Sequence, residues 1–420
     1  MRLSTRMTRL SAPTLAVALA LVACSGGGDG DQVGAPPDPA AGLSGDPIRL
    51  MVQVPLTGPS TRNPEPPVGA KAAARAVNAA GGIKGRPLDI QVCDDQFDPG
   101  KSAGCARLAV GTGVIAYVGA YTGQGDRYMP ILEEAGIPSV GNVAVSASES
   151  TSPLSYPIGA GAAVALAGVG ALMGKLGCQK IAVAYTNTAG PQYVIDTYLQ
   201  RGLDVFGVQI AQRVPIPVTA GDISAYAGPI VSSGADCATV VAGAGVREDV
   251  TLALRGNAAD LKLVFPASDL GPAEIERLGP AAEGMYLAGG AAPAADSENA
   301  GVKLFNQEVD AFGDRTSNRN DAMMTAWAAT HIVADLLAKA ATTDAPGLVA
   351  QIKAAGPIAY DPIVAFDWSK PTGLLPNVRT FSNRLYFTRV RDGRPVALFF
   401  GEPVDITQLP AAPDPGGEPG

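Results

Sequence analysis

The sequence is poor in histidine, aromatic residues and positive charge. Its 420 residues contain a single histidine, at position 331, only 5% aromatic residues, and 31 Lys and Arg against 39 Asp and Glu. A net charge of −8 is the opposite of the basic stripe that nucleic-acid binding requires. One histidine and no Cys-x-x-Cys pair leave no ligand set of the usual zinc type. We therefore expect no nucleic-acid partner, no metal and no cofactor.

Motifs of common enzyme classes are also missing. There is no G-x-S-x-G elbow and no phosphate-binding P-loop. Residues 159–161 and 243–245 (both Gly-Ala-Gly) are only fragments of a dinucleotide fingerprint. A lone histidine leaves few bases for acyl transfer, although carboxylates remain available. We expect a protein that is not an enzyme, and keep carboxylate chemistry as an open alternative.

The first 24 residues have the features of a bacterial export signal. Arg2, Arg6 and Arg9 precede the short apolar run Thr14–Ala23, which is followed by Cys24. The run is too short to span a bilayer, and the ending Leu-Val-Ala-Cys is similar to a lipobox, in which the cysteine is acylated. We expect residues 1–24 to be a lipoprotein signal peptide, with lipidation at Cys24 and attachment to the outer face of the cell membrane. A plain signal with an incidental cysteine is the alternative.

The Gly- and Pro-rich residues 25–46 are predicted to form a flexible tether. The remaining chain is too long for one compact core, so two lobes are expected. Short β-branched runs alternate with amphipathic stretches, which predicts parallel sheets with helical crossovers. The predicted strands are 48–54, 88–93, 114–118, 138–141, 180–185, 205–212, 238–242 and 261–265; the predicted helices are 68–80, 125–135, 162–176, 192–202, 223–233, 247–256, 299–312 and 321–341; antiparallel strands come after them at 363–366, 384–391 and 395–399.

Four cysteines follow Cys24, and in an exported chain an even number favours disulfides. Three pairings are possible. Cys93 ends a predicted strand and Cys105 lies in the helical segment after it. Cys178 and Cys237 each precede an apolar strand, and they would be neighbours if those strands are parallel and adjacent. We predict Cys93–Cys105 and Cys178–Cys237.

Residues 112–144 carry the strongest signal for a binding site. They comprise a strand, the Gly-rich turn 119–125, a helix, and a second strand that ends in the loop 142–144. In open parallel sheets, ligands bind at the carboxyl ends of the strands. We expect Thr122 to cap the helix and the amides of Gly123, Gln124 and Gly125 to be free to attract an anionic or carbonyl oxygen. A tight turn without a ligand is the alternative.

Several motifs in order resemble leucine/isoleucine/valine-binding proteins, the type I periplasmic solute-binding proteins of ABC importers. They are PLTGP at 55–59, NAAGGIKGRPL at 78–88, DDQFDP at 94–99 and EAGIP at 134–138. The resemblance implies an α/β fold of two Rossmann-like lobes joined by three hinge crossings. It places lobe 1 at 47–157 and 289–356, lobe 2 at 158–288 and 357–408, and a disordered tail at 409–420. It also implies an ABC permease as partner.

The resemblance also implies where a ligand would bind. In amino-acid-binding members, hydroxyl groups, tyrosines and a carboxylate hold the ligand; the matching positions here are Gly123, Val145, Gly190, Ala244 and Ser268 or Asp269. Most of the polar groups are therefore replaced, and burying an ammonium without partners is costly. A carboxylate-bearing, amide or less polar solute is expected to fit better than a free α-amino acid. The candidate ligand-binding residues are Tyr121, Thr122, Gly123, Gln124, Asn142, Val143, Ala144, Asn187, Arg247 and Asp269.

Together these features predict an extracytoplasmic, lipid-anchored protein that captures a small molecule for an ABC importer, with an amino acid or a carboxylate-bearing metabolite as candidate ligands. A sensor of the same fold that signals to a membrane partner is the alternative.

Overall fold

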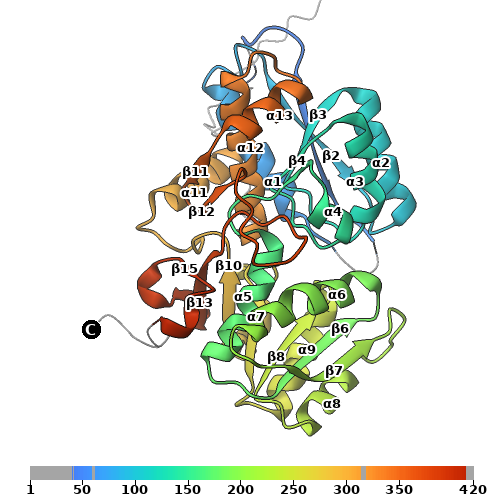
Figure 1. Cartoon of the computed structure of the whole chain (residues 1–420), viewed down its shortest axis with the longest axis vertical. Helices are drawn as coiled ribbons and strands as arrows, with labels where there is room; N and C mark the ends of the chain where they lie inside the picture. Colours follow the sequence, from blue (N-terminus) through green and yellow to red (C-terminus); the bar gives the residue numbers. More distant parts are fainter. Residues whose placement is uncertain (1–39, 41, 59–61, 314–317, 413–420) are drawn as a thin grey trace, which may run out of the picture. The chain divides into compact units, whose positions relative to one another are not determined.

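A computed structural model describes residues 40, 42–58, 62–313 and 318–412. It confirms the α/β class and the two-lobe architecture: each lobe is built on its own sheet, with helices on both faces (Figure 1). The expected signal peptide, Cys24 and residues 25–39 lie outside the described residues. Among the helices described, none is long and apolar enough to span a membrane.

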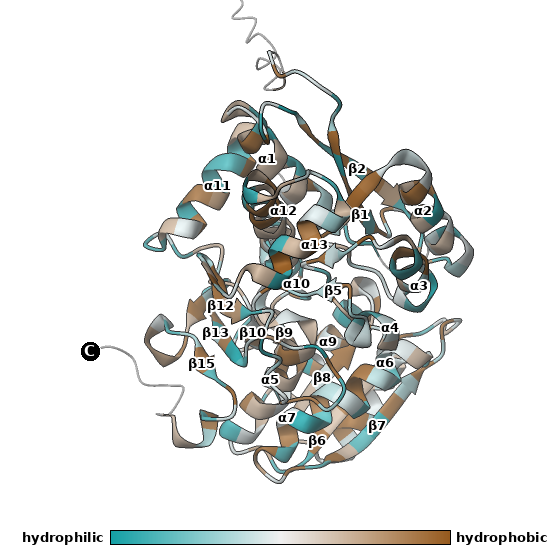
Figure 2. Ribbon diagram, turned by 45° about the horizontal axis from the view of Figure 1, so that its top comes forward, coloured by the Kyte–Doolittle hydropathy of each residue, from teal (hydrophilic) through white to brown (hydrophobic). Residues whose placement is uncertain are grey.

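Lobe 1 contains a parallel sheet of five strands in the order β2-β1-β3-β4-β5. Alternate residues of β1 serve opposite faces: Leu50 and Val52 belong to the core under α1 and α12, and Met51 to the core under α2 and α3. Figure 2 shows β1 as largely hydrophobic. The elements are β1 (Ile48–Val54), α1 (Glu65–Ala79), β2 (Leu88–Asp94), α2 (Pro99–Thr112), β3 (Val114–Val118), α3 (Gly125–Ala135), β4 (Ser139–Val140), α4 (Ala147–Thr151), β5 (Ser155–Tyr156), α11 (Ala300–Phe312), α12 (Asp321–Lys339) and α13 (Ala345–Ala354).

Lobe 2 contains the larger sheet, in the order β14-β13-β10-β9-β8-β6-β7, with β15 paired to β13. Strands β6 to β10 are parallel, and β13 and β14 add an antiparallel edge. The elements are α5 (Gly161–Lys175), β6 (Ile181–Thr186), α6 (Ala189–Val194), a π-helical turn (Ile195–Leu199), α7 (Gln200–Asp204), β7 (Ile210–Ile216), α8 (Ala227–Ser232), β8 (Cys237–Val241), α9 (Ala244–Asn257), β9 (Lys262–Pro266), α10 (Pro272–Leu278), β10 (Tyr286–Gly289), β13 (Arg384–Arg391), β14 (Arg394–Ala397) and β15 (Val404–Asp405).

One strand lies later in the chain than predicted. The strand expected at 205–212 is β7, Ile210–Ile216, and the helix before it extends through α6, the π-helical turn and α7 to Asp204. The apolar residues Phe206 and Val208 are buried or half-buried against the lobe 2 core from a turn at Gly207, whose φ is +68°. Apolar residues in a packed turn therefore produced the same hydrophobic pattern as a strand.

Both predicted disulfides are confirmed. Cys93–Cys105 joins β2 to α2 with a Cα–Cα distance of 5.8 Å, and Cys178–Cys237 joins the turn before β6 to the first residue of β8 at 5.9 Å. The second pairing follows from strand order, because β6 and β8 are parallel neighbours and Ile181 is in register with Cys237. Asp236 lies close to this pair, but both sulfurs are already bonded to each other.

The chain passes between the lobes three times, and these crossings contact one another. The first follows β5, the second follows β10, and the third lies between the two-stranded sheet of β11 (Pro357–Tyr360) and β12 (Ile363–Asp367), and β13. The Val364 amide donates to the Gly290 carbonyl (3.0 Å), and Trp368 Nε1 donates to the Pro157 carbonyl (2.9 Å).

The segment of the third crossing packs on both lobes. Phe366, Trp368 and Phe381 belong to the lobe 1 core, whereas Val364, Leu374, Leu375, Val378 and Leu385 belong to the lobe 2 core. The exact division of the chain into domains stays a proposal.

Both ends of the described body are fixed. Ser44, in the expected tether, donates its amide to the Gly85 carbonyl (3.0 Å), and Arg86 Nε donates to the Asp46 carbonyl (2.8 Å). At the other end, Leu409–Ala411 form a 3₁₀ turn in which Leu409 is fully buried. The disordered tail expected from Leu409 therefore does not begin at that residue, because this leucine fills the lobe 2 core.

Candidate functional site

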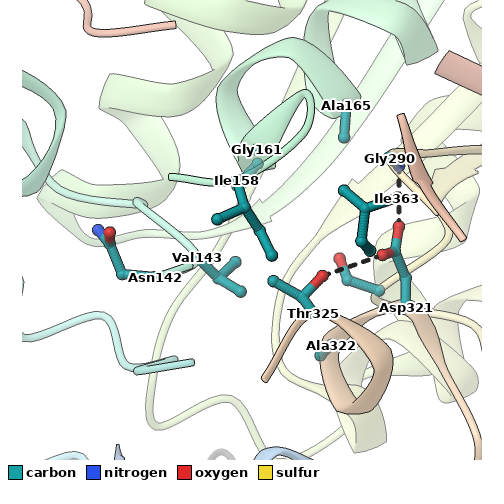
Figure 3. A pocket seen from close by; sticks show the side chains of 12 residues that line it. Asn142, Val143, Ile158, Gly161, Ala165, Gly290, Asp321, Ala322, Thr325 and Ile363 are labelled. Atoms are coloured by element: carbon teal, nitrogen blue, oxygen red, sulfur yellow. Dashed lines mark hydrogen bonds between the residues drawn. The ribbon is translucent and has the colours of Figure 1, made fainter. Parts of the chain in front are cut away.

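A cavity of ≈ 30 Å³ is lined by residues of both lobes and of the crossings (Figure 3). This volume accommodates about two water molecules, or a ligand group of a few heavy atoms. Its lining is mostly apolar or backbone, and none of the lining residues is a Lys, Arg or His. The lining residues are Asn142, Val143, Ile158, Gly161, Ala162, Ala165, Ser268, Gly290, Asp321, Ala322, Thr325 and Ile363.

Two of the ten predicted ligand-binding residues, Asn142 and Val143, line this cavity. The Asn142 amide is turned away from Asp321 and Thr325 (Figure 3) and is hydrogen-bonded to the Ser155 hydroxyl, with Nδ2 donating at 3.1 Å. The cavity's polar side chains are therefore Asp321, Thr325 and Ser268.

Asp321 is the only ionisable side chain in the lining. It is the first residue of α12, whose N-cap Asn320 accepts a hydrogen bond from the Met323 amide. Its Oδ2 accepts from the Gly290 amide at 3.0 Å, and its Oδ1 accepts from the Thr325 hydroxyl at 3.2 Å. No cation pairs with it in the described part of the chain. Burial raises the pKa of Asp321 to about 6, and hydrogen bonds from the Gly290 amide, the Thr325 hydroxyl and the Ala291 amide only partly oppose this shift.

The structure brings three further predicted residues together, across the two lobes. Tyr121, which follows β3 in lobe 1, donates its hydroxyl to Asp269 Oδ1 of lobe 2 at 2.9 Å. Arg247 in α9 lies 3.4 Å from Asp269 Oδ2, donates to the Asp269 carbonyl, and donates to the Ala242 carbonyl at 2.9 Å. Burial and the Asp269 carboxylate raise the pKa of Tyr121 well above its usual value. The Asp269 carboxylate thus has two partners within the protein, the Tyr121 hydroxyl and the Arg247 guanidinium.

The Gly-rich turn is built differently from the prediction. The N-cap of α3 is Gln124, and no side chain caps the helix, so the expected capping by Thr122 is wrong. The Thr122 hydroxyl is buried and has no hydrogen-bond partner among the described residues. A Cβ on Gly123 would lie 2.7 Å from the Phe97 ring, which occupies that space. Gln124 Nε2 donates to the Phe97 carbonyl at 3.2 Å.

Ala144 and Asn187 also lie outside the cavity lining. Ala144 is buried. Asn187 is exposed at the end of β6, where its Oδ1 accepts from Gln192 Nε2 at 2.9 Å. A Cβ on Gly190, at the start of α6, would lie 3.8 Å from the Val145 carbonyl, so these loops of the two lobes approach each other. The ligand contacts of all ten residues stay predictions.

A buried carboxyl group beside the 142–144 loop is absent from the predicted set. Glu149, in α4, accepts hydrogen bonds from the Tyr128 hydroxyl, from the Ser146 hydroxyl (2.8 Å) and from the Val145 amide (3.2 Å). Burial raises its pKa to about 7. The Ser-Ala-Ser-Glu run at 146–149 has the sequence pattern of a capping box, and Ser146 is the N-cap of α4, so this pattern could have located the helix from the sequence.

The only histidine is a packing residue of α12. His331 contacts the Trp327 ring, at 4.9 Å between ring centroids, and its Nε2 lies 2.7 Å from Glu308 Oε2.

Comparisons with known proteins agree with this fold. A model of the periplasmic binding protein family matches residues 47–395, whereas no curated protein matches the sequence. Similar solved structures include the substrate-binding protein LivJ of Streptococcus pneumoniae in complex with isoleucine (16% identity, 85% of this chain and 99% of that one, TM-score 0.69). They also include a solute-binding protein of R. palustris in complex with benzoate (16% identity, 84% of this chain and 95% of that one, TM-score 0.69). A third is a fatty acid ABC transporter substrate-binding protein from Thermomonospora curvata (17% identity, 89% of this chain and 96% of that one, TM-score 0.71).

At these identities the structures establish the fold, and the family match covers most of the chain. The chain therefore belongs to the periplasmic binding protein family, whose members are extracytoplasmic receptors for small molecules.

Proposed function

We propose that this protein is the solute-binding component of an ABC importer and has no enzymatic activity. The observation that carries the proposal is the cavity whose lining includes Val143 of lobe 1, Ala165 of lobe 2 and the crossing residues Ile158 and Gly290. A site built this way is completed only when both lobes contribute, so a ligand in it stabilises the closed arrangement. The structural relatives from S. pneumoniae and R. palustris bind isoleucine and benzoate, which are small organic molecules.

We propose further that the mature protein is attached to the outer face of the cell membrane through an acylated Cys24. The support is the sequence of residues 1–24, with its basic start, its apolar run and its Leu-Val-Ala-Cys ending. Intact-mass analysis of the membrane fraction tests this: an N-terminal diacylated cysteine is expected, and a mature chain starting elsewhere contradicts it.

A thermal-shift screen of small metabolites tests the solute-binding proposal. Binding to the folded state raises the unfolding temperature by an amount set by ligand concentration and Kd. We expect one chemical class to stabilise the protein, and deletion of the gene for this protein to abolish uptake of that class. A screen in which no metabolite class shifts the unfolding temperature, with uptake unaffected by loss of the protein, contradicts the proposal.

A further inference from the structure

We propose that Asp321 is the residue that selects the ligand, and that it receives a positively charged or hydrogen-bond-donating group, such as a primary ammonium. This inference rests on the proposed solute-binding function and concerns the chemistry of the same cavity.

The carboxylate of Asp321 faces the cavity without a cationic partner among the described residues. It accepts hydrogen bonds from the Gly290 amide, the Thr325 hydroxyl and the Ala291 amide, and a carboxylate with about four acceptor sites still has room for one more donor. A buried carboxylate is stable only if it is paired, hydrogen-bonded or protonated. Figure 3 shows Asp321 and Thr325 together on the side of the cavity opposite Asn142. A donor on the ligand would complete the coordination of this group.

The other acidic residue near the lobe boundary is already satisfied. Asp269 accepts from Tyr121 at 2.9 Å and pairs with Arg247 at 3.4 Å. An incoming ammonium would have to compete with the Arg247 guanidinium for Asp269, whereas the donors to Asp321 among the described residues are neutral and none is a cation. The acceptor for a ligand cation is therefore Asp321.

The lining also disfavours anions. A ligand carboxylate in the cavity would face the Asp321 carboxylate without a Lys, Arg or His among the lining residues. Like charges held close in a poorly hydrated site repel each other. The carboxylate-bearing solute expected from the sequence therefore fits this cavity less well than an amine or an amide. The apolar side chains Val143, Ile158 and Ile363 suit a compact aliphatic group beside the donor.

Three probes with one carbon skeleton test the assignment: isobutylamine, isobutyramide and isobutyrate. Their affinities for the purified protein are measured by calorimetry at pH 7.5. We expect isobutylamine to bind best and isobutyrate at least tenfold more weakly. Asp321→Asn keeps an acceptor for the Gly290 amide and removes the charge, so it should weaken isobutylamine at least tenfold and change isobutyramide less than threefold. The matched control is Asp335→Asn, on the exposed side of the same helix, which should leave all three affinities unchanged.

The pH dependence of the wild-type protein gives a second readout that needs no variant. Isobutylamine affinity should rise about tenfold from pH 5 to pH 7 as Asp321 ionises, and Asp321→Asn should remove this dependence. The assignment is overturned if isobutyrate binds as well as isobutylamine, if Asp321→Asn leaves amine binding intact, or if none of the probes binds. None of these results bears on whether the protein binds some solute, which the metabolite screen decides separately.

Discussion

At the scale of single residues, the buried carboxyl of Glu149 has a measurable consequence for stability. Its pKa is about 7 in the folded protein because of burial, against an ordinary value of 4.5. The folded state therefore binds a proton that the unfolded state releases between about pH 5 and pH 7. Stability from this group is fully present below pH 4.5 and is lost as pH rises to 7. Glu65, in the first turn of α1, has a pKa raised in the same way, to about 7, and adds a slope of the same sign.

We predict that Glu149→Gln reduces this pH dependence. The amide is neutral at every pH and can keep partners among Tyr128, Ser146 and the Val145 amide. The free energy of unfolding in urea, measured from pH 5 to pH 8, should fall by roughly 2–3 kcal/mol less in the variant than in the wild type. Glu276→Gln, an exposed position of α10, should leave the slope unchanged. An unaltered slope in Glu149→Gln would show that this carboxyl titrates normally.

The unpartnered hydroxyl of Thr122 gives a second prediction at this scale. Replacing a buried hydroxyl that has no partner by a methyl group removes a desolvation penalty. Thr122→Val should therefore match or exceed the wild-type stability in urea unfolding. Thr380→Val is the matched control, because its hydroxyl is buried and lies 2.7 Å from the Thr372 hydroxyl; it should cost about 1 kcal/mol. A comparable loss in both variants would mean that the Thr122 hydroxyl has a partner such as a bound water.

At the scale of elements, local sequence signals predicted most of the fold. Cys93–Cys105 was predicted from its place in one strand and the helical segment after it. Cys178–Cys237 was predicted on the condition that the two following strands are parallel neighbours, which β6 and β8 are. The errors have a physical origin. A hydrophobic residue indicates burial but not the type of element that carries it. Phe206 lies in a turn and still packs against the lobe 2 core, as a strand residue would. The π-helical turn at Ile195–Leu199 has no sequence signature distinct from that of an α-helix.

The site was predicted less completely because it depends on contacts between distant segments. The helix starting at Asp321 was predicted, but the cavity next to it exists only because Val143, Ala165 and Gly290 meet there. Conversely, Tyr121, Arg247 and Asp269 were expected to contact a ligand, and in the structure they contact one another. Residue types identified the polar groups of the lobe boundary, but not their pairing.

The two disulfides should contribute unequally to stability. A cross-link lowers the entropy of the unfolded chain, and more so for a longer loop. The sequence separations are 12 for Cys93–Cys105 and 59 for Cys178–Cys237. The loop model gives losses of about 3 kcal/mol for the Cys93→Ala/Cys105→Ala pair and about 4 kcal/mol for the Cys178→Ala/Cys237→Ala pair. Calorimetry and urea unfolding of the two double variants check the order; a reversed order would contradict the loop-entropy explanation.

At the scale of the whole molecule, the Tyr121–Asp269 hydrogen bond joins the lobes directly. A hydrogen bond to a carboxylate contributes more than one between neutral groups. Tyr121→Phe should therefore shift the lobes toward separation and speed the dissociation of a bound ligand about tenfold, as stopped-flow release would measure. Tyr226→Phe, in lobe 2 and packed against its own core, is the control. Equal dissociation rates in wild type and Tyr121→Phe would show that this bond forms no part of the closed state.

The contacts of the amino-terminal segment with lobe 1 also determine which of the two lobes can move. Residues 44–46 are fastened to the turn at Gly85–Arg86, immediately before β2. A restraint on the amino-terminal segment therefore acts on lobe 1. Lobe 2 is then the lobe that moves. If Cys24 is acylated as proposed, the membrane therefore holds lobe 1, and closure over a solute moves lobe 2.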